Sequence, residues 1–427
     1  MIRFLYHLVF TLFLLFYIPY SLLRSLFHGR LQPLLLHRMG FVPDLKASRP
    51  VWIHAASVGE VICSIPLFKR IKKEFADLPI LLTTMTQTGN ETARTLLPGA
   101  DPFLFLPFDH PLTIRRAIHR ISPRLVLIAE TEIWPNLLRF CSQGRIPVVV
   151  FNGKISGRSI KGYLRFKSLF RDGLKSVALF LMQTDTDRNR IIQMGALPDR
   201  TKVLGNLKFD QTFPPVTLEE KKAMIASLRL KGEEMLLIAG STHKGEEEIL
   251  LRLFKQLKTE VPNLFLILAP RHLDRLEEVE KILKREEISW ERKTSLSGPE
   301  NLRQEPPSVI VVDTLGELVR LYSLATLVFI GGSLVPVGGH NPLEPLVFKK
   351  CVLFGPYMID FREITKRLVE QGGAVQVEDS RDLFVRLREL LRNEKTRAET
   401  GERGHQFLLK HQGATERTFQ EIRPYLL

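Results

Sequence analysis

The chain has 427 residues, of which 44% are hydrophobic and 25% charged, and its 61 basic and 46 acidic side chains give a net charge of +15. This composition is that of a globular protein and excludes a wholly disordered or fibrous chain, while the length favours more than one domain. The positive charge favours an anionic partner such as acidic lipid or a phosphorylated substrate. Nucleic acid is the least favoured partner, because the basic residues are dispersed and not interleaved with aromatic ones.

The first 30 residues contain the most apolar segment of the chain. Residues 4–23 carry no formal charge, and 20 such residues in a helix are long enough to cross a bilayer core of about 30 Å. Bulky Leu and Phe residues and the lack of a small-residue cleavage site argue against a secretory signal. We therefore expect a membrane anchor over residues 1–30. Pro19 leaves open a helix that ends early and lies partly in the interface.

Basic residues follow this segment at Arg24, Arg30 and Arg38. A basic excess beside an apolar segment is typical of the cytoplasmic side of a membrane. We therefore expect the rest of the chain to stay on the cytoplasmic side of the membrane, with membrane lipids as one of its partners.

Short apolar runs then alternate with helical segments, the pattern of parallel α/β sheets. We expect a first α/β lobe over residues 31–210, a linker at 211–217 (QTFPPVT, two prolines and no periodicity) and a second α/β lobe over 218–400. Residues 401–427 are expected to be helical and to pack back on the first lobe. Expected strands are 51–56, 80–84, 125–130, 148–152, 179–183 and 203–205 in the first lobe, and 235–240, 264–269, 309–312, 327–331 and 352–354 in the second. Such sheets bind ligands at the carboxyl ends of their strands, which predicts a site in the cleft between the lobes.

Acidic residues follow two strands of the first lobe. Ser57 and Glu60 have the S-x-x-E spacing of a capping box, which explains both residues structurally. Glu60 also stands at a strand end, where a carboxylate could act as a general base. Glu130 and Glu132 come directly after the apolar run LVLIA. A carboxylate at a buried strand end needs a partner or a function, and both interpretations remain open.

Lys208, in the run GNLKFD, closes the first lobe. Its ammonium group could balance a phosphate or carboxylate of a ligand. The alternative is a surface salt bridge with Asp210.

Donor groups follow the strands of the second lobe. The run AGSTH at 239–243 precedes an acidic helix start at 246–248, and its Gly, Ser and Thr could offer donors to an anion. Pro270 and Arg271 end the next strand, where an arginine suits bidentate contact with phosphate. Gly316 to Leu318 open a helix shortly after a strand and offer free backbone N–H groups.

Four glycines lie between a strand and a helix at 331–339, and they would let the backbone approach a ligand closely. Asn341 is expected as the N-cap of the helix and Pro342 as its first residue. Glu344 would then either reach back to the cap or accept from sugar hydroxyls. A capping box explains Asn341 and Glu344 but not the glycines.

No metal site is expected. The sequence has no G-x-x-x-x-G-K-[ST] run, no H-E-x-x-H and no D-x-D pair after a strand. Its three cysteines are far apart and form no C-x-x-C pair, which excludes a disulfide scaffold and a zinc ribbon.

Six runs in this order behind the apolar N-terminus resemble the 3-deoxy-D-manno-octulosonic acid (Kdo) transferases: HAASVGE, ETEIWPN, GNLKFD, AGSTHKGEEE, APRH and GGHNPLEP. The resemblance implies a GT-B glycosyltransferase with an N-terminal membrane anchor helix. It implies inverting transfer of Kdo from the donor substrate CMP-Kdo to lipid IVA, the tetraacylated lipid A precursor, at the inner membrane during lipopolysaccharide assembly. It implies no cofactor, and no obligate protein partner is evident.

The resemblance also assigns roles to particular residues. Glu60 resembles the catalytic base of the family, and Glu130 and Lys208 resemble its transition-state stabilisers. The segments that resemble its CMP-binding residues are Pro270 and Arg271; Gly316, Glu317 and Leu318; and Asn341, Pro342, Leu343 and Glu344.

Three residues depart from the family pattern. Gly153 stands where the family has Ala, Lys154 where it has Arg, and Tyr357 where we expect His. A lysine is a point charge and cannot reproduce a bidentate arginine contact. Two alternatives remain: a UDP-sugar-dependent GT-B enzyme of envelope biosynthesis, and a non-catalytic membrane-tethered glycolipid-binding protein.

Overall fold

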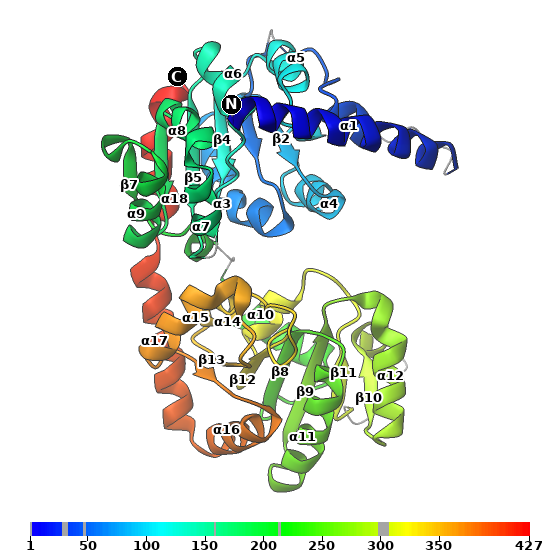
Figure 1. Ribbon diagram of the computed structural model, residues 1–427. Helices are drawn as coiled ribbons and strands as arrows, with labels where there is room; N and C mark the ends of the chain where they lie inside the picture. Colours follow the sequence, from blue (N-terminus) through cyan, green and yellow to red (C-terminus); the bar gives the residue numbers. More distant parts are fainter. Residues whose placement is uncertain (1, 28–32, 46–47, 158, 212–214, 298–306) are drawn as a thin grey trace. The chain divides into compact units, whose positions relative to one another are not determined.

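The computed structural model describes residues 2–27, 33–45, 48–157, 159–211, 215–297 and 307–427, and two compact units divide the chain (Figure 1). Unit 1 contains residues 1–212 and 411–427, and unit 2 contains residues 213–410. Residues 212–214, in the middle of the expected linker, lie outside the described residues. The chain returns to unit 1 at His411 and not at residue 401, because helix α17 (Glu394–His411) remains with unit 2 through Lys410.

Unit 1 is built on a parallel sheet with the strand order β3-β2-β1-β4-β5-β6-β7. The strands are β1 (Val51–His54), β2 (Ile80–Thr84), β3 (Phe103–Phe105), β4 (Leu125–Ala129), β5 (Val148–Gly153), β6 (Leu179–Met182) and β7 (Thr201–Val203). Its helices are α1 (Ile2–Phe27), α2 (Pro33–Arg38), α3 (Val58–Glu74), α4 (Gln87–Leu96), α5 (Pro111–Ile121), α6 (Pro135–Gln143), α7 (Ser159–Arg165), α8 (Lys167–Ser176), α9 (Asp185–Met194) and α18 (Ala414–Ile422).

Helices cover both faces of this sheet, so its central strands are buried along their length and mainly apolar. Val51 and Ile53 of β1 pack in one core with residues of α3 and α18, while Trp52 packs in a second core with residues of α5 and α6. Because alternate side chains of a strand point to opposite faces, a strand buried on both faces reads as a continuous apolar run. This is why these strands are visible in the sequence.

Unit 2 has a second parallel sheet with the order β10-β11-β9-β8-β12-β13-β14. The strands are β8 (Met235–Thr242), β9 (Leu264–Pro270), β10 (Trp290–Arg292), β11 (Val309–Val311), β12 (Leu327–Ile330), β13 (Cys351–Phe354) and β14 (Val375–Gln376). The helices are α10 (Leu218–Ser227), α11 (Glu246–Glu260), α12 (Leu276–Arg285), α13 (Leu318–Tyr322), α14 (Leu343–Leu346), α15 (Arg362–Glu370), α16 (Ser380–Arg392) and α17.

Each of the two sheets has its own topological switch point. In unit 1 the chain adds β2 and β3 on one side of β1 and then places β4 on its other side. In unit 2 the chain completes β9, β10 and β11 on one side of β8 before β12 pairs with its other side. Connections that leave two neighbouring strands in opposite directions open a crevice at their carboxyl ends, and open α/β sheets bind ligands there. The loops after β1 and β4, and after β8 and β12, are therefore where a site is expected in each unit.

Helix α1 is docked on unit 1 along part of its length. The Tyr6 hydroxyl donates to Asp109 Oδ2 at 2.9 Å, and the His7 ring bonds Asn136 Oδ1 at 3.0 Å. The rings of Phe10, Phe13 and Tyr17 pack edge-on against Phe108. The segment Ile2–Ser21 is the single helix among the described residues that is long and apolar enough to cross a membrane.

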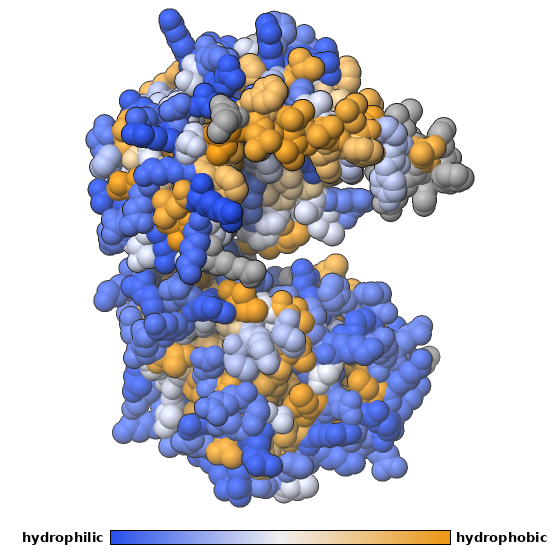
Figure 2. Space-filling model, viewed as in Figure 1, coloured by the Kyte–Doolittle hydropathy of each residue, from blue (hydrophilic) through white to orange (hydrophobic). Residues whose placement is uncertain are grey.

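The other side of α1 is apolar and exposed. Figure 2 shows a row of apolar side chains along the helix. Its exposed residues include Phe4, Leu5, Leu8, Val9, Leu12, Leu15, Phe16, Tyr20 and Leu23. The helix therefore has one face packed on the protein and one face without a partner among the described residues. Arg30 and the side chain of Arg24 lie outside the described residues.

Candidate active site

Glu60 lies in the first turn of α3, directly after the loop that leaves β1. Ser57 is the N-cap, and its side chain accepts from the Glu60 N–H at 3.4 Å. The Glu60 carboxylate accepts from the Ala56 N–H at 2.6 Å and from the Ser57 hydroxyl at 3.2 Å. The expected capping box is thus incomplete, because Glu60 reaches the N–H one residue before the cap. Capping accounts for part of its bonding and leaves a half-buried carboxylate at the switch point.

Burial raises the pKa of Glu60 to about 7. The charges of Glu130 and Glu132 raise this pKa further, and the hydrogen bonds from Ala56 and Ser57 oppose them. A general base works best when its pKa lies near the working pH. Glu60 has that property.

Glu130 follows β4 in a left-handed conformation, with φ of 53°. Its N–H donates to the Phe151 carbonyl at 2.9 Å, and its Oε1 lies 3.8 Å from Lys208 Nζ. These two side chains are 25% and 17% exposed, respectively. The half-buried acid after β4 therefore has a partner, and that partner is Lys208, which was expected at the same site.

The turn that carries Lys208 is held by Asn152, at the end of β5. Asn152 Oδ1 accepts from the Leu207 N–H at 3.0 Å. Asp210, the alternative salt-bridge partner of Lys208, instead accepts from the N–H groups of Gly413 and Thr415 and caps α18. The ion pair of Lys208 is thus with Glu130, while Asp210 bonds the backbone at the start of α18.

Glu132 is a residue that the expected catalytic set leaves out. Its side chain is half-buried, and burial raises its pKa. The charge of Glu130 adds to this shift. Three carboxylates and Lys208 thus lie close enough to influence one another. The sequence signal for Glu132 was the second acid of the ETE run.

At the end of β5 this sequence departs from the family pattern, and packing explains the glycine at position 153. A Cβ atom added to Gly153 would meet the Met182 Sδ at 2.5 Å. The alanine of the family pattern would therefore require Met182 to move. Lys154 takes part in the loop through its backbone, since its N–H donates to Thr131 Oγ1 at 3.0 Å.

In unit 2, Arg271 follows β9 and is exposed. Its N–H donates to the Thr242 carbonyl at 3.0 Å, which ties this residue to the end of β8. Among the described residues its guanidinium has no hydrogen-bond or ion-pair partner. Arg271 therefore offers a cationic donor group beside the switch point.

Glu344 has a pKa raised to about 7 by burial. The hydrogen bond from the Asn341 amide, at 3.2 Å, and the charge of Arg271 oppose this shift. The helix starts later than expected, because Pro342 is the cap of α14 and Leu343 its first residue. Asn341 still accepts from the Leu343 N–H at 3.1 Å.

The turn at Gly316–Leu318 offers its backbone. Gly316 has φ of 87°, and Glu317 precedes α13. The Glu317 carboxylate lies 2.8 Å from Lys293 Nζ and accepts from the Thr314 hydroxyl at 2.7 Å. Any ligand contact of this turn would therefore come from its N–H groups.

The glycine loop after β12 packs against its own protein. The buried Glu246 carboxylate accepts from the N–H groups of Gly332 (2.7 Å), Ser333 (2.9 Å) and Leu334 (2.9 Å). A Cβ atom at Gly331 would collide with the Ser241 carbonyl. Packing and hydrogen bonding within the protein therefore explain the glycines at 331 and 332. Their presence does not require a ligand. Sequence reasoning missed this role of Glu246, whose signal was an ordinary acidic helix start.

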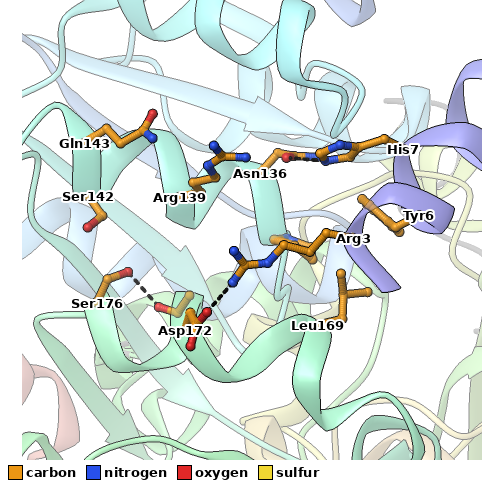
Figure 3. A pocket seen from close by; sticks show the side chains of 12 residues that line it. Arg3, Tyr6, His7, Asn136, Arg139, Ser142, Gln143, Leu169, Asp172 and Ser176 are labelled. Atoms are coloured by element: carbon orange, nitrogen blue, oxygen red, sulfur yellow. Dashed lines mark hydrogen bonds and ion pairs between the residues drawn. The ribbon is translucent and has the colours of Figure 1, made fainter. Parts of the chain in front are cut away.

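A separate pocket of about 160 Å³ lies between α1, α6 and α8 (Figure 3). Its polar lining includes Arg3, His7, Arg139 and Asp172, and Arg3 reaches across to pair with Asp172. Glu60, Glu130 and Lys208 do not line it. This pocket belongs to the docking of α1 and not to the acid cluster.

Residues 35–211 match the family model of the 3-deoxy-D-manno-octulosonic-acid transferases (kdotransferases). The chain is 36% identical to the 3-deoxy-D-manno-octulosonic acid transferase of Haemophilus influenzae over 92% of this chain and 91% of the relative. It is 30% identical to that of Chlamydophila psittaci over 96% and 93%.

Among solved structures, the UDP-GlcNAc 2-epimerase of Neisseria meningitidis bound to UDP-GlcNAc aligns with a TM-score of 0.59 and 14% identity, covering 88% of this chain and all of the epimerase (100%). At that identity the likeness concerns the fold alone, which is the two-lobed GT-B architecture. The similarity to the two transferases extends over nearly the whole of both. The chain therefore belongs to the 3-deoxy-D-manno-octulosonic acid (Kdo) transferase family.

Proposed function

We propose that this protein is an inverting glycosyltransferase that moves Kdo from CMP-Kdo to lipid IVA, with Glu60 as the general base. The observation that carries the proposal is the position of Glu60 at the switch point of unit 1, with a pKa of about 7. The acceptor is a sugar hydroxyl, which does not ionise at neutral pH. A carboxylate that takes its proton as it attacks lowers the barrier of a single displacement.

The residues of unit 2 suit the donor. Arg271 offers a guanidinium that no described residue pairs with, and it can stabilise the phosphate charge that develops on the departing CMP. Glu344 and Asn341 offer acceptor and donor groups to the nucleoside. A monophosphate leaving group needs less neutralisation than a diphosphate, so we propose that transfer requires no metal ion.

Arg271→Ala is expected to raise the Kd of CMP about 10- to 100-fold, because a hydrogen bond to a charged group contributes about 1.5–3 kcal/mol. Calorimetric titration of the full-length protein in detergent measures this. Arg252→Ala removes an exposed arginine of α11 that pairs with Glu248, and we expect it to leave CMP binding unchanged. An unaltered Kd in the Arg271 variant would remove this residue from the donor site.

The same titration separates the donor classes. We expect CMP to bind at least about tenfold more tightly than UDP, a difference of about 1.4 kcal/mol. Tighter binding of UDP would favour a UDP-sugar enzyme of the same architecture. Binding of lipid IVA without any consumption of CMP-Kdo would favour a non-catalytic glycolipid-binding protein.

We further propose that α1 attaches the protein to the cytoplasmic face of the inner membrane by lying in the interface. Tyr6, His7 and Thr11 bond to Asp109, Asn136 and His110 of the same unit. These polar contacts hold that face of the helix on the protein and turn its apolar face outward. A helix of this kind buries one face in the lipid boundary.

A topology measurement checks this attachment. A single cysteine in place of Arg3, whose side chain is 45% exposed and pairs with Asp172 on the protein-facing side of α1, is expected to react with a membrane-impermeant maleimide in inverted vesicles but not in spheroplasts. The three native cysteines are buried and give little background. Labelling from the periplasmic side would mean that the helix spans the bilayer.

The exposed apolar face of α1 also predicts how strongly the protein partitions into membranes. Leu8→Asp with Phe16→Asp should reduce membrane partitioning more than about tenfold, since burial of each such side chain contributes about 1.5–3 kcal/mol. Val385→Asp replaces an exposed apolar residue of unit 2 (52% exposed). This control is expected to leave partitioning unchanged, as measured by vesicle flotation.

A further inference from the structure

Three histidines gather at the switch point of unit 2. His243 follows β8, His340 ends the loop after β12, and His272 follows β9. The Nε2 atoms of His243 and His340 lie 2.8 Å apart, and their rings are nearly parallel, with an interplanar angle of 7°. His272 lies edge-on to His243, with ring centroids 5.5 Å apart. None of these side chains belongs to the expected site residues.

The pair is held in place from two sides. The buried Glu246 carboxylate accepts from the backbone N–H of His243 at 3.0 Å. It also accepts from the backbone N–H of Gly332, in the loop that leads to His340. Gly332, with φ of 67°, lies against both rings: a Cβ atom there would come within 3.2 Å of His340 Cδ2 and 3.4 Å of His243 Cδ2. The two rings are therefore fixed by the backbone and are not surface side chains that happen to meet.

The contact fixes how many protons the pair can hold. A bond between two Nε2 atoms needs a proton on one of them and a lone pair on the other. With two protons both rings are neutral. A third proton, on an outer Nδ1 atom, makes one ring an imidazolium and keeps the bond. A fourth would place two N–H groups head to head and break it.

The charges around the pair keep the third proton off in the free protein. Burial and the nearby cations Arg271 and Arg275, together with His272, lower the pKa of His243. Burial, His243, Arg271 and His272 lower the pKa of His340 to about 4. Arg275 is itself paired with Glu247 and Glu278. The acid Glu246 faces the pair from α11, but four backbone N–H groups occupy its carboxylate.

We propose that the His243–His340 pair helps to bind the donor's phosphate, and that the pair takes up one proton when this anion binds beside Arg271. The incoming negative charge offsets the cations that exclude the proton, and the resulting imidazolium adds an attraction that the free protein lacks. The proton comes from solvent and stays on the pair, and no covalent bond changes. This inference rests on the proposed CMP-dependent function and deepens it.

The test is calorimetric titration of CMP into the full-length protein in detergent at pH 7.5, repeated in buffers of different ionisation enthalpy. We expect uptake of about one proton per CMP bound, and a Kd that rises up to about tenfold per pH unit between pH 7 and 8.5. Cytidine, which lacks the phosphate, should bind without proton uptake. His340→Gln and His243→Gln should each still bind CMP but lose the uptake and the pH slope. His119→Gln, an exposed histidine of unit 1, should keep both.

The outcomes separate this inference from the proposed function. CMP binding without proton uptake overturns the inference and leaves the function standing. Uptake that persists in both pair variants overturns the assignment to these residues. If UDP binds and CMP does not, both the inference and the proposed function are wrong.

Discussion

Glu60→Gln is expected to lower the rate of Kdo transfer at pH 7.5 by about 10²–10⁴-fold, the usual contribution of a general base. The glutamine carbonyl oxygen can still accept from the Ala56 N–H, and its amide NH2 can donate to the Ser57 hydroxyl oxygen, so the start of α3 is preserved while the base is lost. CMP affinity is expected to be unchanged, because the donor residues belong to unit 2. Single-turnover transfer and CMP titration measure the two effects separately.

The pKa of Glu60 also predicts how the rate of transfer changes with pH. Burial raises the pKa of Glu60 to about 7, so the carboxylate needed for catalysis forms only as the pH rises through that value. We expect kcat/KM of the wild type to increase about tenfold per pH unit below pH 7 and to level off above it. The Gln variant should lack this rise.

Glu220→Gln is the matched control. Glu220 completes a true capping box with Thr217 at the start of α10, so its replacement tests what the loss of a capping carboxylate does by itself. Transfer within about twofold of wild type is expected there. Near-normal transfer by Glu60→Gln would reduce Glu60 to a capping residue and remove it as the base.

Lys208→Met is expected to reduce transfer by about 10²–10³-fold, the range seen when one preorganised electrostatic group is removed from a site. Lys208 is a cation beside the acid cluster, with its Nζ 3.8 Å from Glu130 Oε1. Without it the three carboxylates repel one another, and the pKa of Glu60 rises further. The rising limb of the pH–rate profile should therefore move to higher pH.

Two further variants make this prediction specific. Lys202→Met removes an exposed lysine that pairs with Glu421 on the surface, and transfer should be unaffected. Adding Glu130→Gln to Lys208→Met removes one of the repelling charges and should move the rising limb back. A profile that stays in place in Lys208→Met would mean that Lys208 does not influence the base.

The interior of both sheets was predictable because those strands are buried on both faces. The strand at 125–129 is a continuous apolar run, those at 80–84 and 148–152 begin with apolar runs of three and four residues, and the structure confirms all three strands. Strands β3, β10 and β14 were not predicted, and all three lie at sheet edges. An edge strand is short and only partly buried, as the half-buried WER of β10 illustrates, so it leaves no apolar run. The edge strand expected at 203–205 in fact begins earlier, at Thr201.

The candidate site was predictable where one strand end carries its own signal. An apolar run that changes abruptly to acids identifies Glu130, and S-x-x-E identifies Glu60. The ion pair between Lys208 and Glu130 was not predictable, because the two residues are far apart in the sequence and meet only through the order of β4, β5 and the turn held by Asn152. The same holds for His243 and His340, which the pairing of β8 with β12 brings together.

The most direct test of the proposed function is a mass-spectrometric transfer assay. Purified full-length protein in detergent would receive lipid IVA and CMP-Kdo generated in situ, with EDTA present. We expect lipid IVA to gain the mass of one or more Kdo residues despite the chelator. An unshifted acceptor beside an active donor control would contradict Kdo transfer to lipid IVA, and transfer that appears only after a divalent metal is restored would contradict its metal independence.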